Sequence, residues 1–252
     1  ASSSFATALT TEGDVNADGY SDLLVGSPDF DATPNGNEGR VQLFLGGADG
    51  LASTAQWTYT GTIAGGRLGA ALAFAGDVND DGWADVLLGA PRASLGQLQE
   101  GVAYLFHGNA TGALANTPSW SFESNQTGAF LGESVAGAGD VDGDGYTDVF
   151  LGAPGIAHAG FQNSGSVLVF RGSASGLALA PVATIDNPLP GAFRFGAAVA
   201  NAGDLNRDGR TELLVGAPDT SAPEFREGRA YVYLGSGVAI AATPAFTVES
   251  DV

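Results

Sequence analysis

Four copies of one acidic loop recur along the chain, and their spacing constrains the fold more than any other feature. Their first aspartates stand at positions 14, 77, 140 and 204, so successive copies begin 63, 63 and 64 residues apart. The loops are Asp14-Val-Asn-Ala-Asp-Gly-Tyr-Ser-Asp22, Asp77-Val-Asn-Asp-Asp-Gly-Trp-Ala-Asp85, Asp140-Val-Asp-Gly-Asp-Gly-Tyr-Thr-Asp148 and Asp204-Leu-Asn-Arg-Asp-Gly-Arg-Thr-Glu212. A period of this length indicates that each loop belongs to a larger repeated unit. We expect one domain over residues 1–252, with units at approximately 4–66, 67–129, 130–193 and 194–252.

Each unit contains four strand-like segments, which are short, rich in β-branched or aromatic residues, and bounded by Gly or Pro. In the first unit these are Phe5–Thr10 before the acidic loop, Leu23–Pro28 after it, Val41–Gly46 and Gln56–Thr60. The continuous apolar run of the second segment indicates a strand buried on both faces. Helical periodicity is absent from the sequence. The chain is therefore predicted to be all-β, with about sixteen short antiparallel strands joined by tight turns.

The acidic loops have the composition of calcium sites. Calcium takes six to eight oxygen ligands, and acids at alternate positions of a loop can converge on one centre. We predict that the side chains at loop positions one, three, five and nine and the backbone carbonyl at position seven are ligands, while the Gly at position six permits the tight turn. The predicted ligands are Asp14, Asn16, Asp18, Tyr20, Asp22, Asp77, Asn79, Asp81, Trp83, Asp85, Asp140, Asp142, Asp144, Tyr146, Asp148, Asp204, Asn206, Asp208, Arg210 and Glu212. About four Ca²⁺ ions per chain follow.

Two other interpretations of these loops fit the sequence less well. An EF-hand begins similarly but needs flanking helices and a Glu at its twelfth position, where this chain has Val25, Leu88, Leu151 and Val215. An acidic Gly-rich turn can also be a solvated hairpin end, an interpretation that four copies in register disfavour. The third loop carries four carboxylates and is expected to bind calcium most tightly, whereas Glu212 changes the closing position of the fourth.

The net charge of −19 arises largely from these loops. Thirteen of the 28 acidic residues occupy loop positions one, three, five or nine, against nine basic residues in the chain. Without metal the loops would repel themselves, and four calcium ions would bring the net charge to about −11. A charge of this sign argues against nucleic acid or an anionic membrane surface as a partner. The sequence has no Cys, which excludes disulfides, and no apolar stretch long enough for a membrane-spanning helix.

Four-stranded antiparallel sheets repeated radially form the blades of a β-propeller. This repeat resembles the FG-GAP repeat of integrin α-subunit propellers and of many bacterial surface proteins. The resemblance lies in three motifs that recur in order: a Phe/Leu-Gly pair, the Asp-x-Asn/Asp-x-Asp-Gly-x-x-Asp loop and a Gly-Ser/Ala-Pro stop. Ala6 replaces the Gly of the pair in the first unit. The resemblance covers essentially the whole chain and implies four four-stranded blades.

The chain departs from the family pattern in blade number. Integrin propellers close with seven blades, whereas four units are present here, and no latch between the two ends is visible in the sequence. Three arrangements therefore stay open: a compact four-blade ring, half of a two-chain eight-blade ring, or a fragment of a longer propeller. An unclosed set would leave two exposed blade faces.

The sequence gives little support to an enzyme. It has no Cys, only two histidines, and no recognisable Ser, His and acid set, so we predict no catalytic residue. His107 precedes the Gly that ends a third segment and is expected to be a tolerated strand-end residue. His158 lies in a variable loop, where it could touch a ligand, and is expected to be exposed to solvent. Paired acids can hydrolyse glycosides, but nearly all the clustered acids of this chain are assigned to metal.

Recognition is expected where the units differ, on the blade face opposite the acidic loops. Variable loops on a rigid scaffold commonly carry binding. These loops span residues 29–38, 92–100, 155–164 and 219–227, with 60–67, 124–130 and 187–194 beside them, and contain Phe30, Phe161, Phe225, Arg92, Arg194 and Arg226. Integrin propellers are similar in using that face for ligands, although no individual contact residue transfers. Asn109-Ala-Thr111 and Asn125-Gln-Thr127 fit the N-glycosylation pattern.

The sequence thus predicts a calcium-stabilised, extracellular or cell-surface binding or adhesion module for protein or glycan. Secretion is inferred because sites of this kind fill at extracellular calcium, about 10⁻⁴ to 10⁻³ M. The alternatives are a calcium-dependent lectin, a self-assembling structural repeat protein and a non-catalytic accessory domain of a secreted enzyme. A homo-oligomer is among the outcomes that the open blade number allows.

Overall fold

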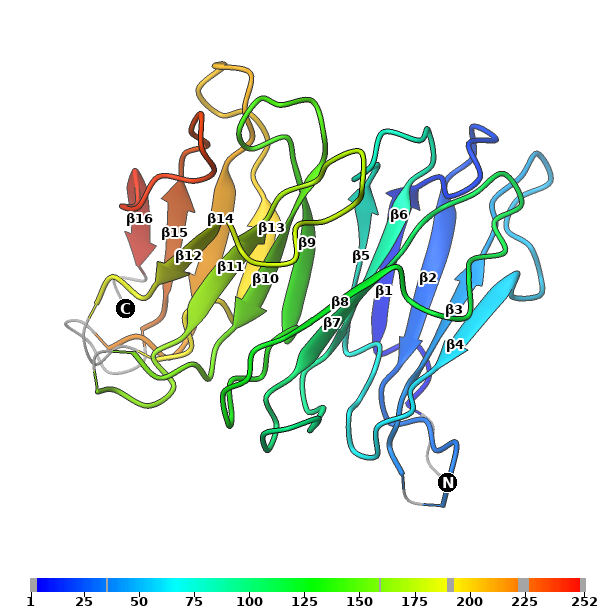
Figure 1. Ribbon diagram of the computed structural model, residues 1–252, viewed down its shortest axis with the longest axis horizontal. Helices are drawn as coiled ribbons and strands as arrows, with labels where there is room; N and C mark the ends of the chain where they lie inside the picture. Colours follow the sequence, from blue (N-terminus) through cyan, green and yellow to red (C-terminus); the bar gives the residue numbers. More distant parts are fainter. Residues whose placement is uncertain (1–3, 35, 159, 190–192, 222–226, 250–252) are drawn as a thin grey trace.

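The computed structural model describes residues 4–34, 36–158, 160–189, 193–221 and 227–249. Its sixteen β-strands form four antiparallel sheets of four strands each (Figure 1). No helix in these residues is long and apolar enough to cross a membrane. The all-β class and the four four-stranded sheets are therefore as the sequence predicts.

Each sheet contains four consecutive strands in chain order and forms one blade. The first blade contains β1 (Ala8–Gly13), β2 (Asp22–Ser27), β3 (Arg40–Phe44) and β4 (Trp57–Thr60). The second contains β5 (Ala71–Gly76), β6 (Asp85–Ala90), β7 (Val102–Phe106) and β8 (Trp120–Glu123). The third contains β9 (Ser134–Gly139), β10 (Asp148–Ala153), β11 (Ser166–Phe170) and β12 (Ala183–Asp186). The fourth contains β13 (Ala198–Asn201), β14 (Leu213–Ala217), β15 (Arg229–Tyr233) and β16 (Phe246–Glu249).

The predicted segments placed the Phe/Leu-Gly pair inside the first strand of each blade. In the structure the pair lies before that strand. The backbone N–H of Leu68 donates to the carbonyl of Glu38 in the preceding blade at 3.0 Å. Gly69 has a positive φ of 83° and donates its own N–H to Gly89 of its own blade at 3.0 Å. The pair therefore turns the chain from one blade into the next, and β5 begins only after this turn.

Apolar side chains fill the space between neighbouring blades. In β6, Val86 and Leu88 belong to the core shared with the first blade, whereas Leu87 belongs to the core shared with the third. This alternation confirms burial on both faces for β6, whereas the prediction is wrong for β14 of the fourth blade, where Leu214 is exposed. Tryptophans of the fourth strands close the first two interfaces. Trp57 packs edge-on against Phe106 with ring centroids 4.9 Å apart, and Trp120 packs likewise against Phe170 at 5.0 Å.

The four blades form an open arc. Their first strands contact each other in the order β1, β5, β9 and β13, and Figure 1 shows the first and fourth blades at opposite ends of the row. A closed ring of four would place β1 beside β13, and the described strands do not adopt that arrangement. At the outer face of the fourth blade, Leu205 (61%), Leu214 (37%), Phe246 (62%) and Val248 (51%) are exposed. An apolar blade face is thus left uncovered, as expected for an unclosed set.

Glycine at the Gly-Ser/Ala-Pro motif allows neighbouring blades to approach closely. A Cβ added at Gly26, Gly89 or Gly152 would lie 2.2, 2.0 or 2.1 Å from a carbonyl oxygen of the next blade. Gly216, the equivalent residue of the fourth blade, differs because the nearest atom to its added Cβ is the Ala198 Cβ at 3.3 Å. The first three glycines are therefore required by blade packing, and the fourth is not.

We expect Gly89→Ala to lower the free energy of unfolding by about 2 kcal/mol or more, because the methyl group overpacks the interface with the third blade. The matched change Gly216→Ala should be nearly neutral. Urea unfolding of both variants measures the difference. Equal destabilisation by the two changes would contradict the account and would indicate that the outer face of the fourth blade is covered in solution.

Candidate metal centres and a cavity on the opposite face

The acidic loops join the first and second strands of each blade and share one hydrogen-bond pattern. In the first loop, Asp14 Oδ1 accepts from the Asp18 N–H at 3.1 Å and Asp14 Oδ2 accepts from the Gly19 N–H at 2.8 Å. Asp18 Oδ1 accepts from the Tyr20 N–H at 2.9 Å. The other loops repeat these bonds through Asp77 and Asp81, Asp140 and Asp144, and Asp204 and Asp208.

Position six of each loop requires glycine for its backbone conformation. Gly19, Gly82, Gly145 and Gly209 have φ angles of 88°, 93°, 97° and 87°. A Cβ added to any of them would meet no atom within 4 Å, so space is not the constraint. The structure confirms the tight turn predicted from the sequence and shows that its glycine is left-handed.

The carboxylate at position nine has a structural role that the sequence analysis missed. Asp22, Asp85 and Asp148 begin the second strands and are fully buried. Asp22 Oδ2 accepts from the Val15 N–H at 2.8 Å, and its Oδ1 accepts from the Gly46 N–H at 2.9 Å. Asp85 and Asp148 make the same two bonds. Each therefore ties its acidic loop to the end of the third strand. The sequence did not predict this link, because the third strand lies more than ten residues further along the chain.

Burial disfavours the charged form of these carboxylates. Desolvation raises the pKa of Asp148 to about 6, against the lowering effect of its two backbone donors. It also raises the pKa of Asp22, with smaller contributions from the neighbouring charges of Asp14 and Asp18. A bound cation would act in the opposite direction, because positive charge favours the ionised carboxylate.

In each of the third and fourth loops, three acidic oxygens lie close together. One oxygen from each of Asp140, Asp142 and Asp148 lie within 4.8 Å of one another, and the same holds for Asp204, Asp208 and Glu212. Among the described residues, the first and second loops form no such acidic group. Asn16 and Asn79 hold their third position, as Asn206 does in the fourth loop. In all three of these loops the Asn amide donates to the position-five Asp, at 3.0, 2.8 and 3.0 Å.

The donor set fits a hard divalent cation. Every predicted ligand atom is an oxygen of a carboxylate, a carboxamide or a backbone carbonyl, as calcium prefers. Asn79 Oδ1 and Glu212 Oε1 are buried and accept no hydrogen bond from a described residue, which leaves them available to an ion. In the third loop Arg171 forms an ion pair with Asp142, so calcium would compete there with a guanidinium. The assignment of individual ligands stays a prediction.

Three of the four loops are held between blades. The carbonyls of Asp14 and Val15 accept from the N–H groups of Ala84 and Asn109 in the next blade, at 3.1 and 2.9 Å. Val15, Val78 and Val141 at position two are fully buried in the interfaces. Leu205, at the same position of the fourth loop, is 61% exposed. Loop order in the first three repeats is thus coupled to blade stacking.

Each of the two histidines lies beside an aspartate. His107 Nδ1 lies 3.1 Å from Asp85 Oδ1, and this hydrogen bond raises the pKa of the imidazole. His158 Nδ1 lies 3.3 Å from Asp186 Oδ2 at the surface. Ser166 Oγ donates to Asp186 Oδ1, the other oxygen of that carboxylate, at 2.7 Å, so the described partner of this hydroxyl is the acid and not the His158 ring.

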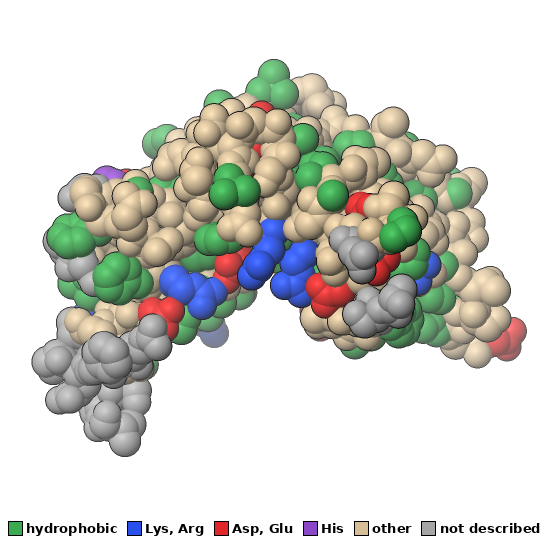
Figure 2. Space-filling model, turned by 90° about the horizontal axis from the view of Figure 1, so that it is seen from below, with side chains coloured by type: hydrophobic (Ala, Val, Ile, Leu, Met, Phe, Trp, Pro, Cys, Tyr) green, Lys and Arg blue, Asp and Glu red, His purple; other side chains and the backbone are tan. Residues whose placement is uncertain are grey.

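A cavity of about 830 Å³ opens at the opposite end of the strands from the acidic loops. It is lined by repeat-equivalent positions of several blades, and Figure 2 views the concave side of the arc from this end. Most of the lining residues are prolines of the first three Gly-Ser/Ala-Pro motifs, residues following a motif proline, and residues on either side of the Phe/Leu-Gly pairs. They include Pro28, Pro91, Pro154, Arg92, Asp219, Arg67, Phe130, Arg194, Ala70 and Glu133. Its volume is typical of a ligand site.

Of the residues that the sequence analysis named on this face, some line the cavity and others do not. Arg92 and Arg194 line the cavity, together with Arg67 and Phe130 at the ends of the flanking segments. Phe30 instead packs beneath the Arg40 guanidinium at 4.0 Å. Phe161 is exposed in its own loop. Phe225 and Arg226 lie outside the described residues.

Buried glutamates fix two of the variable loops. Glu100 Oε1 accepts from the N–H groups of Leu95, Gly96 and Gln97, at 2.7, 2.6 and 3.0 Å. Burial opposes ionisation of Glu100, but these donors together outweigh it and lower its pKa. Glu38 has the equivalent place in the first blade and accepts from Thr33 and from the Ala32 N–H. Both loops are therefore ordered on the cavity side.

The fold and its loops define an all-β repeat protein with propeller-like blades. A family model described as FG-GAP repeat matches residues 5–44, and one described as FG-GAP-like repeat matches 77–151 and 140–215. The chain belongs to the FG-GAP repeat family.

Three relatives illustrate its similarities. The chain is 37% identical over 167 residues to integrin alpha-5 of Xenopus laevis, covering 63% of this chain and 15% of the integrin. It is 36% identical over 146 residues to integrin alpha-IIb of Homo sapiens, covering 56% and 14%. It is 34% identical over 168 residues to phosphatidylinositol-glycan-specific phospholipase D of Mus musculus, covering 64% and 20%. The matches thus span a fifth or less of each relative.

We expect Asp85→Asn to lower the free energy of unfolding by about 2 kcal/mol in calcium-free buffer. The amide retains one acceptor but turns an NH₂ group toward a buried backbone donor, which then lacks a partner. Asp80→Asn in the same loop is the matched control, because Asp80 is exposed and Asn tolerates its φ of 59°. Urea unfolding compares the two, and equal stabilities would contradict the tie between loop and third strand.

The raised pKa of Asp148 predicts a pH dependence of the calcium-free protein. A carboxyl whose folded pKa is about 6 rather than 3.8 favours folding while it is protonated, and this contribution is lost as the pH rises through 6. From this group alone, the free energy of unfolding should fall by about 1 kcal/mol between pH 5 and 7. The difference between wild type and Asp148→Asn across this range measures it. A constant difference would contradict the assignment.

Proposed function

We propose that the chain is a calcium-stabilised, non-catalytic binding or adhesion module that acts outside the cell or at its surface. The observation that carries this proposal is the separation of two faces. The acidic loops occupy one end of the strands, and the cavity lies at the other. A scaffold stiffened at one end and hollowed at the other can hold a ligand without using the metal for chemistry.

Calcium would have a structural role in this proposal. The side chains at loop positions one, three, five and nine, with the position-seven carbonyls, would hold about four ions per chain. Bound calcium neutralises the repulsion among the carboxylates of each loop. Since the first three loops lie between blades, their residues would transmit that order to the stack. Weak calcium sites are filled at the extracellular calcium concentration of about 10⁻³ M, which favours an extracellular location.

We infer one domain over residues 1–252, with repeats at about 4–66, 67–129, 130–193 and 194–252. The continuous packing from the first blade to the fourth supports a single unit, because each interior blade contributes side chains to two cores. The uncovered face of the fourth blade supports a second arrangement, in which another blade or another copy of the chain covers it.

The ligand is proposed to be a protein or a glycan on the cavity face. Similarity to two integrin alpha chains supports an adhesion role for this repeat. Similarity to a protein named as a phospholipase D supports a second candidate, a non-catalytic domain accompanying an enzyme in a longer protein. The acidity of the chain disfavours nucleic acid, and membrane insertion is not part of the proposal.

The proposal predicts calcium-dependent binding through the cavity. Labelled protein at about 1 mM calcium would be applied to peptide and glycan arrays, with and without a chelator. Ala70→Trp fills the cavity and should remove binding, whereas Ala110→Trp places the same ring on an exposed residue at the acidic-loop face and should not. Binding that survives both chelation and Ala70→Trp would contradict the proposal.

A further inference from the structure

The cavity concentrates positive charge in an acidic protein. All nine basic side chains of the chain are arginines, against 28 acids. Three of them, Arg67, Arg92 and Arg194, line the cavity, and Figure 2 shows basic side chains gathered along the inside of the arc. The lining residues include two carboxylates, Glu133 and Asp219. The lining therefore carries one more positive than negative charge, opposite in sign to the chain as a whole.

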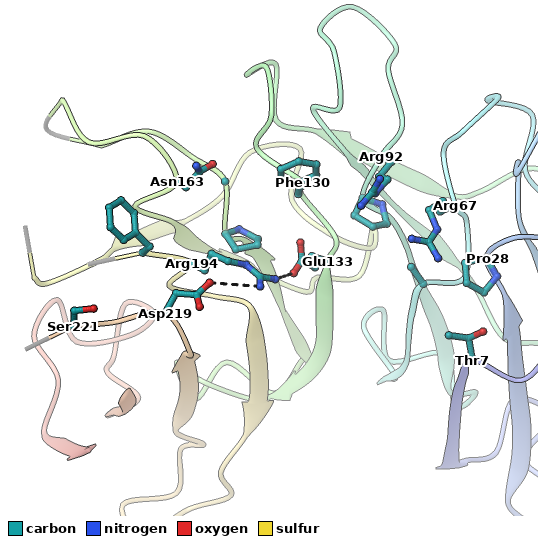
Figure 3. A pocket seen from close by; sticks show the side chains of 15 residues that line it. Thr7, Pro28, Arg67, Arg92, Phe130, Glu133, Asn163, Arg194, Asp219 and Ser221 are labelled. Atoms are coloured by element: carbon teal, nitrogen blue, oxygen red, sulfur yellow. Dashed lines mark hydrogen bonds and ion pairs between the residues drawn. The ribbon is translucent and has the colours of Figure 1, made fainter. Parts of the chain in front are cut away.

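Two of these arginines have carboxylate partners. Arg194 pairs with Glu133, and its Nη1 lies 3.8 Å from Asp219 Oδ2 (Figure 3). Arg67 Nη2 lies 2.8 Å from Asp29 Oδ1. These ion pairs orient both guanidinium groups and compensate most of their charge.

Arg92 is different. It is exposed, it forms no ion pair within the described ranges of the chain, and no dashed line reaches it in Figure 3. Its backbone N–H donates to the Gly66 carbonyl at 3.3 Å, which places Arg92 beside the residue preceding Arg67. Arg67 has its one described carboxylate partner in Asp29, so the neighbouring Arg92 charge is left uncompensated.

Comparison of the repeats shows why Arg92 lacks a partner. The residue after the motif proline is Asp29, Arg92, Gly155 and Asp219 in the four repeats. The residue before the Phe/Leu-Gly pair is Arg67, Phe130 and Arg194 in the last three. Between the first and second blades these positions form the Asp29–Arg67 ion pair. Between the second and third they hold Arg92 and Phe130, so a cation and an aromatic ring replace an acid and its partner.

We propose that this cavity binds an acidic peptide through a carboxylate held by Arg92. This inference rests on the proposed function above. A guanidinium has only donors and an ionised carboxylate only acceptors, so the two match in a bidentate pair. The rings of Phe130 and the motif prolines offer apolar surface to a neighbouring side chain of the peptide. Sugar hydroxyls both donate and accept, and the neutral polar side chains that line the cavity are few: Thr7, Asn163 and Ser221.

Paired peptides test this inference. Octapeptides with one Asp or Glu beside an aromatic or aliphatic residue would be compared with Asn or Gln versions, alongside an array of sulfated and uronic glycans. Calcium-loaded wild type should bind the acidic member at least about tenfold more tightly than its neutral counterpart. Arg92→Ala should lose a similar factor, and Arg92→Asp, which restores the acid of the first and fourth repeats, should lose more.

The control is Arg207→Ala, which removes the same charge from an exposed residue at the acidic-loop face and should leave peptide affinity unchanged. Equal affinity for acidic and neutral peptides, or an unchanged affinity after Arg92→Ala, would overturn the inference. If Arg92→Ala left peptide affinity unchanged but Ala70→Trp removed peptide binding, the inference about Arg92 would fail and the proposed function would stand. Binding of anionic glycans alone would overturn the peptide assignment, and no binding to either array would count against the proposed function as well.

Discussion

The face-to-face packing of neighbouring blades is the constraint on which the rest of this structure depends. Each interior sheet is apolar on both faces, so it is stable only when a blade covers each side. β6 illustrates this, since Leu87 faces one neighbour while Val86 and Leu88 face the other. The close approach at Gly89 leaves no room for a methyl group. Stability is therefore shared along the row, as in other repeat proteins, and the uncovered fourth blade marks where that support ends.

The acidic loops take part in this packing rather than lying outside it. A buried position-nine aspartate ties each of the first three loops to its own third strand. Backbone carbonyls at the loop starts accept bonds from the next blade. Calcium bound in such a loop would order residues that belong to a blade and to an interface at once.

The sequence was sufficient for the features that one repeat determines locally. Alternation, turn residues and a regular period predicted about sixteen strands, and the glycine at loop position six predicted the tight turn in which Gly19 has a positive φ. It was insufficient where one blade meets another. The placement of Leu68 and Gly69 before β5, the buried role of Asp22 and the open arc all depend on neighbours distant in the sequence. The cavity is a similar case, because Arg67 and Phe130 become equivalent lining residues only when blades stack side by side.

We propose that the four acidic loops hold calcium and that this metal stabilises the stacked blades. Native mass spectrometry of the chain, before and after chelation and combined with thermal unfolding, tests it most directly. The account predicts a mass increase equal to about four calcium ions per chain, lost on chelation together with a fall in the unfolding temperature. A mass without bound calcium, and an unfolding temperature that the chelator leaves unchanged, would show that the loops are only solvated turns.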